Sequence, residues 1–297
     1  MRPPSWALIA EELSPVLGKS GDPIRSQPVG GGCINEAYVL SRGKRSVFVK
    51  TNAADQSPMF EAEVAGLEAL RETETVRIPE VYASGVTGSH AWIAMEYLSM
   101  SRARQNSQEE LGRQLAGLHR VTQSHYGWER DNTIGSTPQR NSPRKDWVEF
   151  LREERLRFQF SRAVQRGGQF EGAGELLDRL GEFFGDYDPL PALLHGDLWS
   201  GNVGFTRGGQ PFIFDPAVYF GDREAEFGII EMFGGFGAGF YQGYAAEWPL
   251  DPGFDRRKDL YLLYHQLNHF NLFGSSYGPS VRKSIRRLLS RLEENRA

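Results

Sequence analysis

The fold is decided by the stretch His195-Gly196-Asp197-Leu198-Trp199-Ser200-Gly201-Asn202, which is followed by the apolar run Pro211-Phe212-Ile213-Phe214 and then by Asp215. An Asp, an Asn five residues later and a second Asp at the end of a strand are the residues that Mg²⁺-dependent phosphoryl transfer uses. A carboxylate can accept the proton of an attacking hydroxyl, and hard oxygen ligands suit Mg²⁺. We therefore expect Asp197 to accept the proton, and Asn202 and Asp215 to hold the metal.

These polar residues would also suit ordinary turns, because Asp and Asn near Gly often form them. The apolar runs on either side of these residues favour a functional site over an ordinary turn. Residues 192–194 and 212–214 are strand-like, so the polar residues fall in loops at strand ends, where sites are usually built. One match of this kind is weak, and the rest of the chain must supply further elements in the right order.

The composition bounds the class of protein. The chain has 297 residues, a net charge of -4 and a single cysteine. Lys and Arg are dispersed among acids, so we expect no nucleic-acid-binding face. No apolar run approaches the roughly 20 residues that cross a bilayer, and no secretory leader is visible, so we expect no membrane partner. One cysteine rules out an intrachain disulfide framework and indicates a cytoplasmic location.

Three glycines near the N-terminus lie between strand-like runs, directly before Cys33. Glycine lets backbone N–H groups approach phosphate oxygens closely, so Gly31 and Gly32 are candidates for covering a nucleotide's phosphates. The pattern is neither a Walker nor a Rossmann motif, because no Gly-Lys-Ser/Thr follows and strands flank it. Taken alone, the glycines indicate only a flexible hairpin.

Lys50 ends an apolar strand, as the β3 lysine of kinases does. A helix is predicted over 59–70, with Glu63 beside its apolar stripe. Glu61 is the rival partner, but two residues away it lies on a different face of the helix. We expect Glu63 to hold Lys50 against the phosphates; the simpler alternative is a solvent-exposed lysine and an ordinary surface acid.

The strand predicted over 91–98 suits the last strand and linker of a small lobe. There, backbone groups of Glu96 and Leu98 could hydrogen-bond adenine, although ordinary surface roles are equally open. Ser107 is expected to cap a helix that contains Leu111 and reaches His119, which we expect to pack or cap. Further helices are predicted over 6–17, 146–164, 171–184, 261–273 and 281–292.

This order predicts an α+β, bilobal, protein-kinase-like fold. A small antiparallel β-rich lobe over 1–98 would bind nucleotide, and a large, mainly helical lobe over 99–297 would hold the catalytic and substrate residues.

The chain resembles the fructosamine (ketosamine) kinases, which are relatives of the aminoglycoside phosphotransferases in the protein-kinase-like superfamily. The His-Gly-Asp start of the loop is shared across the superfamily, whereas the other matches narrow the resemblance to the family. The matching pieces are Gly30-Gly31-Gly32-Cys33-Ile34, Met59-Phe60-Glu61-Ala62-Glu63-Val64, His195-Gly196-Asp197-Leu198-Trp199-x-Gly-Asn202, Phe214-Asp215-Pro216-Ala217, Met232-Phe233-Gly234-Gly235-Phe236 and Leu267-Asn268-His269-x-Asn271-x-Phe273-Gly274.

The resemblance implies ATP- and Mg²⁺-dependent phosphorylation of O3 of a ketoamine sugar attached to an amine, including lysine side chains of proteins. The 3-phosphate is unstable and eliminates, which frees the amine and amounts to deglycation. Bacterial relatives look more suited to ribulosamines and erythrulosamines than to fructosamines, and the motifs do not decide between them.

Acceptor residues are expected around the catalytic loop and the late helix. A flat indole suits the C–H face of a sugar, so Trp199 is a candidate platform, with a core tryptophan as the alternative. The resemblance places the late helix near the acceptor, where His269 and Asn271 could bond sugar hydroxyls. Asn268 and His269 could equally be packing residues. Glu224 and Glu226 are expected to brace the loop rather than to bind metal.

Cys33 gives a redox hypothesis. It lies beside the phosphate-covering glycines and near Lys50, which could lower the pKa of its thiol. We consider that its oxidation, as an intermolecular disulfide, suppresses ATP binding; the simpler alternative is a small half-buried residue. The chain would then be a monomer or a redox-dependent homodimer.

Three other functions remain open. An aminoglycoside or small-metabolite kinase would share every ATP-site residue and differ in its acceptor. A protein Ser/Thr kinase is disfavoured, because His-Gly-Asp and Asp-Pro-Ala replace His-Arg-Asp and Asp-Phe-Gly. A non-catalytic pseudokinase is opposed by the full set of phosphoryl-transfer residues.

Overall fold

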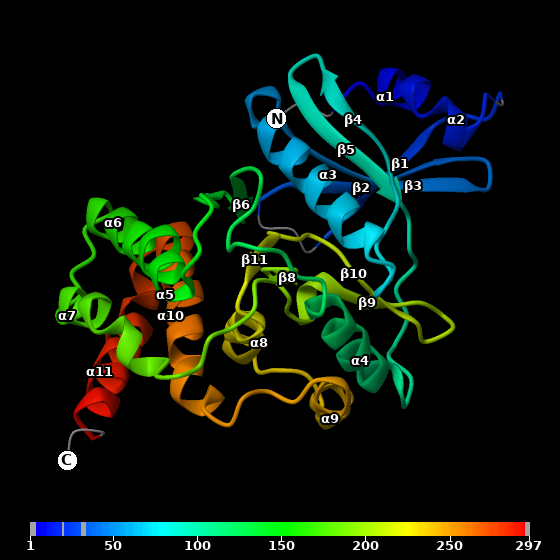
Figure 1. Cartoon of the computed structure of the whole chain (residues 1–297). Coiled ribbons are helices and arrows are strands. Elements are labelled where there is room, and N and C mark those ends of the chain that lie inside the picture. Colours follow the sequence, from blue (N-terminus) through cyan, green and yellow to red (C-terminus); the bar gives the residue numbers. More distant parts are fainter. Residues whose placement is uncertain (1–3, 20, 31–33, 295–297) are drawn as a thin grey trace.

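The computed structural model describes residues 4–19, 21–30 and 34–294. They form a smaller part built on an antiparallel sheet and a larger, mainly helical part (Figure 1). This confirms the predicted α+β class. The expected lobe boundary after residue 98 falls between the last strand of the sheet and the next long helix, and we propose that the chain passes there from one lobe to the other.

The smaller part holds one five-stranded sheet in the order β1-β2-β3-β5-β4, with every neighbouring pair antiparallel. A tight turn at Gly43 joins β2 to β3. The elements are α1 (Trp6–Glu12), α2 (Ser14–Leu17), β1 (Arg25–Val29), β2 (Glu36–Arg42), β3 (Arg45–Ala53), η1 (Ala54–Gln56), α3 (Ser57–Glu72), β4 (Val81–Thr87) and β5 (His90–Glu96).

Side-chain alternation along the strands aims Lys50 at α3. Val47 and Val49 of β3 lie in a core cluster with Ile9 of α1 on one face of the sheet. Because successive residues of a strand point to opposite faces, Lys50 points to the other face. There, Phe60 of α3 packs in the main core. The sheet therefore delivers one lysine to the helix that carries Glu63.

The larger part is mostly helical, with three short two-stranded sheets, β6–β7, β8–β11 and β9–β10. Its elements are α4 (Ser107–His119), β6 (Asn132–Ile134), β7 (Thr137–Gln139), α5 (Trp147–Phe150), η2 (Leu151–Arg157), α6 (Phe158–Gln165), α7 (Ala173–Asp178), η3 (Leu180–Phe183), β8 (Ala192–Leu194), η4 (Ser200–Asn202), β9 (Val203–Phe205), β10 (Pro211–Ile213), β11 (Tyr219–Gly221), η5 (Arg223–Ala225), α8 (Glu226–Met232), α9 (Ala238–Glu247), α10 (Phe254–Phe273), η6 (Ser275–Tyr277) and α11 (Gly278–Glu294).

Three predicted helices are interrupted. The helix expected over 6–17 breaks at Leu13, and Pro15 stands in the first turn of the second piece, where proline is tolerated. The helix expected over 146–164 contains a π-helical turn, η2, in its middle. The helix expected over 171–184 ends at Asp178 and continues as a 3₁₀ turn. Periodicity located these helical segments but not the type of turn within them.

The expected N-cap at Ser107 is wrong. Ser107 is the first residue of α4, and Asn106 occupies the cap position without a side-chain hydrogen bond. The buried Ser107 hydroxyl instead donates to the Gly209 carbonyl at 2.7 Å. This bond ties the start of α4 to the turn between β9 and β10.

The β6–β7 hairpin lies between the two parts (Figure 1). A methyl group placed on Gly135, at its tip, would lie 3.0 Å from the side chains of Ile34 and Leu272. Ile34 lies shortly before β2 of the sheet, and Leu272 belongs to α10. The hairpin therefore bridges the part that holds the sheet and the helical part of the molecule.

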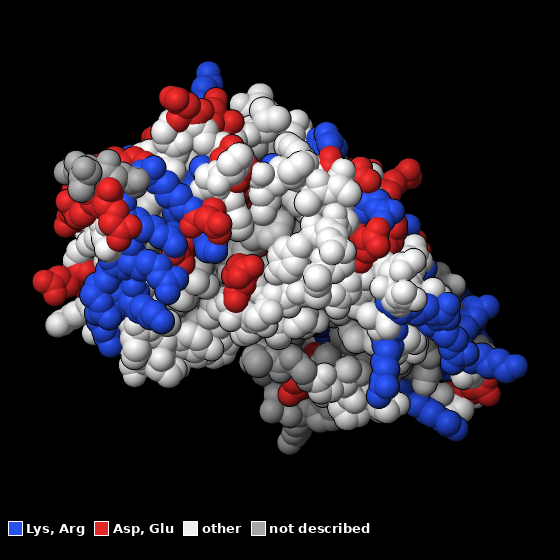
Figure 2. Space-filling view, turned by 90° about the horizontal axis from the view of Figure 1, so that it is seen from below, with Lys and Arg blue, Asp and Glu red and all other residues white. Residues whose placement is uncertain are grey.

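Charged residues gather unevenly on the surface. On the face seen from below, Lys and Arg form two separate groups at opposite ends, with mostly uncharged side chains between them (Figure 2). The left-hand group lies at the end of the molecule that holds α7 and α11. No helix among the described residues is long and apolar enough to cross a membrane.

Candidate functional site

The structure brings Asp197, Asn202 and Asp215 together. Asp197 follows β8, Asn202 ends η4, and Asp215 follows β10. The Asn202 side-chain nitrogen donates to the Asp197 backbone oxygen at 2.8 Å and to its Oδ2 at 3.2 Å. The same nitrogen lies 3.5 Å from the Asp215 carbonyl. The loop and the strand end that the sequence singled out thus meet at one point.

Asp215 adopts a backbone conformation that few side chains favour. Its φ is 59°, in the left-handed region that Asp tolerates better than most residues. This turn points its carboxylate at Lys50, and Lys50 Nζ forms an ion pair with Asp215 Oδ1. Backbone strain of this kind is typical of functional sites.

Lys50 also pairs with Glu63, at 2.6 Å between Nζ and Oε1. Both side chains are about nine-tenths buried. Burial alone opposes the charge, but the carboxylates of Asp215 and Glu63 outweigh it and raise the pKa of Lys50. The ammonium is therefore charged and held in place. The expected choice of Glu63 over Glu61 agrees with this geometry, because Glu63 forms the ion pair with Lys50 whereas Glu61 is exposed.

The pKa of Asp197 is raised well above its ordinary value. Burial is the main cause, and the nearby carboxylates of Asp215 and Glu226 add to it, whereas the hydrogen bond from Asn202 opposes it. A carboxylate with a raised pKa is a stronger base than one in water. This suits a residue that accepts a proton from a hydroxyl.

His195 connects the loop that carries Asp197 to the strand end before Asp215, and its ring has a defined protonation state. The Asp197 backbone N–H points at its Nδ1 at 3.3 Å, so Nε2 carries the hydrogen and donates to the Phe214 carbonyl at 3.0 Å. Burial lowers the pKa of His195, which keeps the ring neutral. This role of His195 was not predicted from the sequence, where the residue counted only as part of its motif.

Gly196 allows the loop to approach its neighbour. Its φ is 82°, and an added Cβ would lie 2.1 Å from the Ala217 carbonyl oxygen. The adjacent His195 carbonyl accepts a hydrogen bond from the Ala217 N–H at 2.8 Å. Only glycine fits both the backbone conformation and the contact.

Glu226 holds the loop from below. Its carboxylate accepts the backbone N–H groups of His195 at 2.7 Å, Gly196 at 3.0 Å and Leu198 at 3.3 Å. Burial would raise its pKa, but these bonds and the neighbouring histidines lower it overall. The expected bracing role is confirmed for Glu226. It is wrong for Glu224, whose carboxylate pairs with Arg257 at 2.8 Å.

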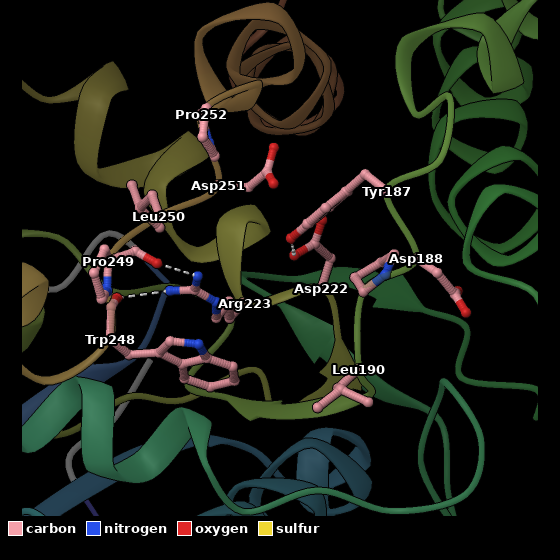
Figure 3. A pocket seen from close by; sticks show the side chains of 11 residues that line it. Tyr187, Asp188, Leu190, Asp222, Arg223, Trp248, Pro249, Leu250, Asp251 and Pro252 are labelled. Carbon is pink, nitrogen blue, oxygen red and sulfur yellow. Dashed lines mark hydrogen bonds between the residues drawn. The ribbon is translucent and has the colours of Figure 1, made fainter.

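A chain of polar contacts leads away from Glu226. His119, buried as expected, lies 3.6 Å from Glu226 through Nε2, and its Nδ1 bonds the Tyr244 hydroxyl at 2.8 Å. Arg223 donates to the same hydroxyl at 3.1 Å. Arg223 also donates to the carbonyls of Trp248 and Pro249, at the wall of a hollow of about 320 Å³ (Figure 3).

This hollow is separate from the candidate site. In the β8–β11 pair, Gly221 lies opposite Ala192, and Tyr219 lies opposite Leu194. The hollow is lined by Asp222, directly after β11, whereas Asp197 follows the other end of the pair. It therefore opens at the opposite end of these strands.

The proposed adenine contacts lie where β5 ends. The Glu96 backbone N–H donates to the Glu80 carbonyl at 2.8 Å, and its carboxylate pairs with Arg77 at 2.6 Å. Leu98 is half-buried in the segment that follows the strand. An adenine contact at Glu96 would therefore have to use its carbonyl. The other nucleotide candidates, Gly31 and Gly32, and the redox candidate Cys33 lie outside the described residues.

The late motif on α10 divides between two faces. Asn268 and Asn271 are buried, and the Asn271 amide donates to the Gln159 side chain at 2.7 Å, in the contact with α6. His269 points elsewhere, with Phe233 at 5.4 Å and Phe273 at 5.5 Å between ring centroids. Burial favours packing for both asparagines, and the sugar contact expected of Asn271 stays a prediction.

Trp199 lies on the same side as His269. Its ring is half-buried and lies 4.6 Å from that of Phe233, between centroids. Phe233, Phe273 and Tyr277 were not among the expected site residues. Phe233 and Phe273 stand in quoted motifs, so their presence was visible, but their grouping around one histidine was not.

The donor set fits Mg²⁺. Oxygen ligands from Asp215 and Asn202 match the preference of this ion, which is usually held by one or two carboxylates together with substrate phosphates. The Asp215 side chain is 38% exposed and open to a ligand. No cluster of three His, Cys, Asp or Glu side chains suited to a metal occurs in the part of the chain that the structure describes.

The sequence is similar to those of known ketoamine kinases. The profile of the fructosamine kinase family matches residues 5–291. A probable ketoamine kinase of Synechocystis is 43% identical over 97% of this chain and 98% of its own length. The chloroplastic protein-ribulosamine 3-kinase of Arabidopsis thaliana is 42% identical over 96% of this chain and 90% of its own.

Solved structures show the same fold. A putative fructosamine-3-kinase of Haemophilus somnus superposes with a TM-score of 0.87 at 29% identity, covering 95% of this chain and 96% of its own. An aminoglycoside phosphotransferase, crystallised with AMP-PNP and hygromycin B, has a TM-score of 0.58 at 14% identity over 95% and 97% of the two chains. At that identity the second likeness concerns the fold alone, which is that of the kinase-like phosphotransferases.

Proposed function

The chain belongs to the fructosamine kinase family, and we propose that it is an ATP-dependent kinase that phosphorylates O3 of ketoamines, the sugar adducts of amines. The observation that carries the proposal is the joining of Lys50, Glu63, Asp197, Asn202 and Asp215 in one site. Relatives named ketoamine kinase and protein-ribulosamine 3-kinase support the acceptor class.

In this proposal Asp197 does the chemical work on the acceptor. Its carboxylate orients the O3 hydroxyl and accepts its proton as the new O–P bond forms. Asn202 donates to that carboxylate in the structure, which fixes its direction. His195 and Glu226 hold the backbone around it, so the loop needs little rearrangement during the reaction.

Lys50 and the acidic residues handle the nucleotide. Lys50, braced by Glu63, binds the phosphates, while Asn202 and Asp215 would hold Mg²⁺, which would supply positive charge beside the transferring phosphoryl group. Gly31 and Gly32 cover the phosphates. The Glu96 carbonyl and the Leu98 backbone receive adenine. These roles are inferred from the residue types, their positions along the chain and the contacts given above.

The acceptor site is proposed around Trp199 and His269. Trp199 offers a flat face two residues from Asp197, and His269 lies one ring further out, across Phe233. The product 3-phosphate eliminates and frees the amine, so the biological role is deglycation of small amines or of protein lysines. A cytoplasmic location, and a monomer or redox-dependent homodimer, stay predictions.

Phosphate transfer from ATP tests the proposal. The acceptors are ribulose-, erythrulose- and fructose-lysine, with kanamycin and choline as controls and Asp197→Ala as the blank. We expect turnover on ketoamines only, abolished in the variant, and the panel then ranks the sugars. Turnover on kanamycin or choline alone would overturn the acceptor, and silence on every acceptor would favour a non-catalytic nucleotide-binding protein.

A further inference from the structure

Five aromatic rings form a continuous strip next to the catalytic loop. We call Trp199, Phe233, His269, Phe273 and Tyr277 the aromatic strip. Ring centroids lie 4.6 Å apart from Trp199 to Phe233, and 5.4 Å apart from Phe233 to His269. His269 then contacts Phe273 at 5.5 Å and Tyr277 at 5.2 Å. The strip thus runs from a residue two positions after Asp197 to the end of α10 and the turn beyond it.

Two members of the strip are unusually exposed. Phe233 is 39% and Phe273 49% exposed, and they are the two phenylalanines among the exposed large apolar side chains of the described residues. Both lie against the same histidine. Packing does not require this arrangement, because the opposite face of α10 packs through Asn268 and Asn271. Exposed apolar groups gathered beside a site indicate a ligand contact.

The histidine at the centre presents a hydrogen-bond acceptor. His269 Nδ1 lies 2.9 Å from the His265 carbonyl, which can only accept, so Nδ1 carries the hydrogen and Nε2 has the free lone pair. Burial lowers the pKa of His269, so the ring is neutral near pH 7. A neutral acceptor among ring faces repels no cation.

The substrate class of the proposed function offers such a cation. In a ketoamine the nitrogen is attached to C1, three bonds from C3, and therefore lies roughly 4 Å from the carbon that carries the reacting hydroxyl. An alkyl amine is protonated at neutral pH. The strip begins at Trp199, two residues after Asp197, so a sugar bound with O3 at Asp197 can place this nitrogen on the strip.

We propose that the aromatic strip binds the charged secondary amine of the ketoamine, with ring faces around the ammonium and His269 Nε2 accepting one of its hydrogens. Ring faces attract cations through their electron-rich surface. The strip would thereby select sugars attached through nitrogen over free sugars and over sugars attached through oxygen. The inference rests on the proposed function and names the group that its acceptor site recognises.

The test compares two acceptors that differ in one atom. One is a ribulose adduct linked through nitrogen to an N-protected lysine, and the other is the ether analogue in which oxygen replaces that nitrogen. For the parent protein we expect kcat/KM about tenfold higher for the amine, since desolvated cation contacts with several rings give preferences of this order. Equal values for the two acceptors would overturn the inference while leaving the kinase in place.

Variants separate ring faces from apolar contact. Phe233→Leu combined with Phe273→Leu keeps apolar side chains and removes two faces, so kcat/KM for the amine should fall about tenfold and that for the ether by less than twofold. Tyr277→Phe, which keeps its face, should retain the preference that Tyr277→Leu weakens. An equal fall on both acceptors would reduce the strip to an apolar contact and overturn the inference. Failure of the parent on both acceptors would overturn the proposed function itself.

Discussion

The carboxylate of Glu226 lies 2.7 Å from the backbone nitrogen of His195, so the first residue of helix α8 holds the first residue of the loop that carries Asp197. Two further N–H groups of the loop donate to the same carboxylate. A buried acid that satisfies three backbone donors fixes the loop without touching a substrate.

Glu226→Gln should lower both stability and turnover. The amide keeps the size of the side chain, but its NH₂ group faces backbone donors, and a buried donor left without a partner costs about 1–3 kcal/mol. We expect the free energy of unfolding to fall by about that amount. We also expect kcat to fall by a larger factor than the factor by which KM changes. Glu231→Gln, an exposed position on the same helix, is the control, with a change within about 0.5 kcal/mol. Equal stability of the two variants in urea would contradict this account.

Glu63→Gln and Glu61→Gln form a matched pair on α3. Of these two acids only Glu63 contacts Lys50, so its substitution should leave the lysine held by Asp215 alone and raise KM for ATP about tenfold, the loss expected from one hydrogen bond between charged groups. Glu61→Gln should leave KM for ATP unchanged. Titration of the nucleotide at saturating acceptor measures both, and a larger effect at Glu61 would reverse the assignment.

Gly196→Ala should destabilise the fold by more than the backbone conformation alone explains. Its Cβ would meet the Ala217 carbonyl oxygen, whereas at Gly88, also at positive φ, an added Cβ meets nothing within 4 Å. We expect about 1–2 kcal/mol for Gly88→Ala from the left-handed backbone and at least about 3 kcal/mol for Gly196→Ala. Denaturant unfolding of both variants separates strain from collision; equal losses would show that no collision occurs.

Asp197→Asn should stabilise the protein at high pH while abolishing turnover. The folded-state pKa of Asp197 is raised, so between its unfolded value and that raised pKa the folded state binds more protons, and ionisation penalises folding as pH rises. Asparagine removes the penalty. The melting temperature of the variant minus that of the parent should therefore grow from acid to alkaline pH. A flat difference would mean that Asp197 titrates in the folded protein as it does in the unfolded chain.

The pairing of Lys50 with Glu63 could be predicted from the sequence because it depends on local spacing. Strand alternation sets the face on which Lys50 lies, and helix spacing separates Glu63 from Glu61. The proposed acceptor site depends on tertiary packing. Both faces of the late motif on α10 carry polar and aromatic residues, so its pattern could not show that Asn271 packs while His269 does not.

Other features escaped for physical reasons. The π-helical turn in 151–157 differs from an α-helix in its hydrogen-bond spacing, and the amino-acid composition does not reveal this spacing. The β6–β7 hairpin has strands of three residues each, which are too short to show an alternation of apolar and polar residues. Glu226 was expected to brace the loop, but the number of backbone donors that it satisfies follows only from the position of α8.

The two faces of α10 separate residues that stabilise the fold from residues that we propose contact the substrate. Asn268 and Asn271, three residues apart, serve the contact with α6 and its neighbours, and His269 and Phe273, four apart, serve the aromatic strip. The two pairs share a helix but no hydrogen-bond partner. Laboratory evolution toward a different amine adduct can therefore vary His269 and Phe273 while Asn268 and Asn271 keep the protein folded. This makes α10 the natural place to change the substrate specificity of the enzyme.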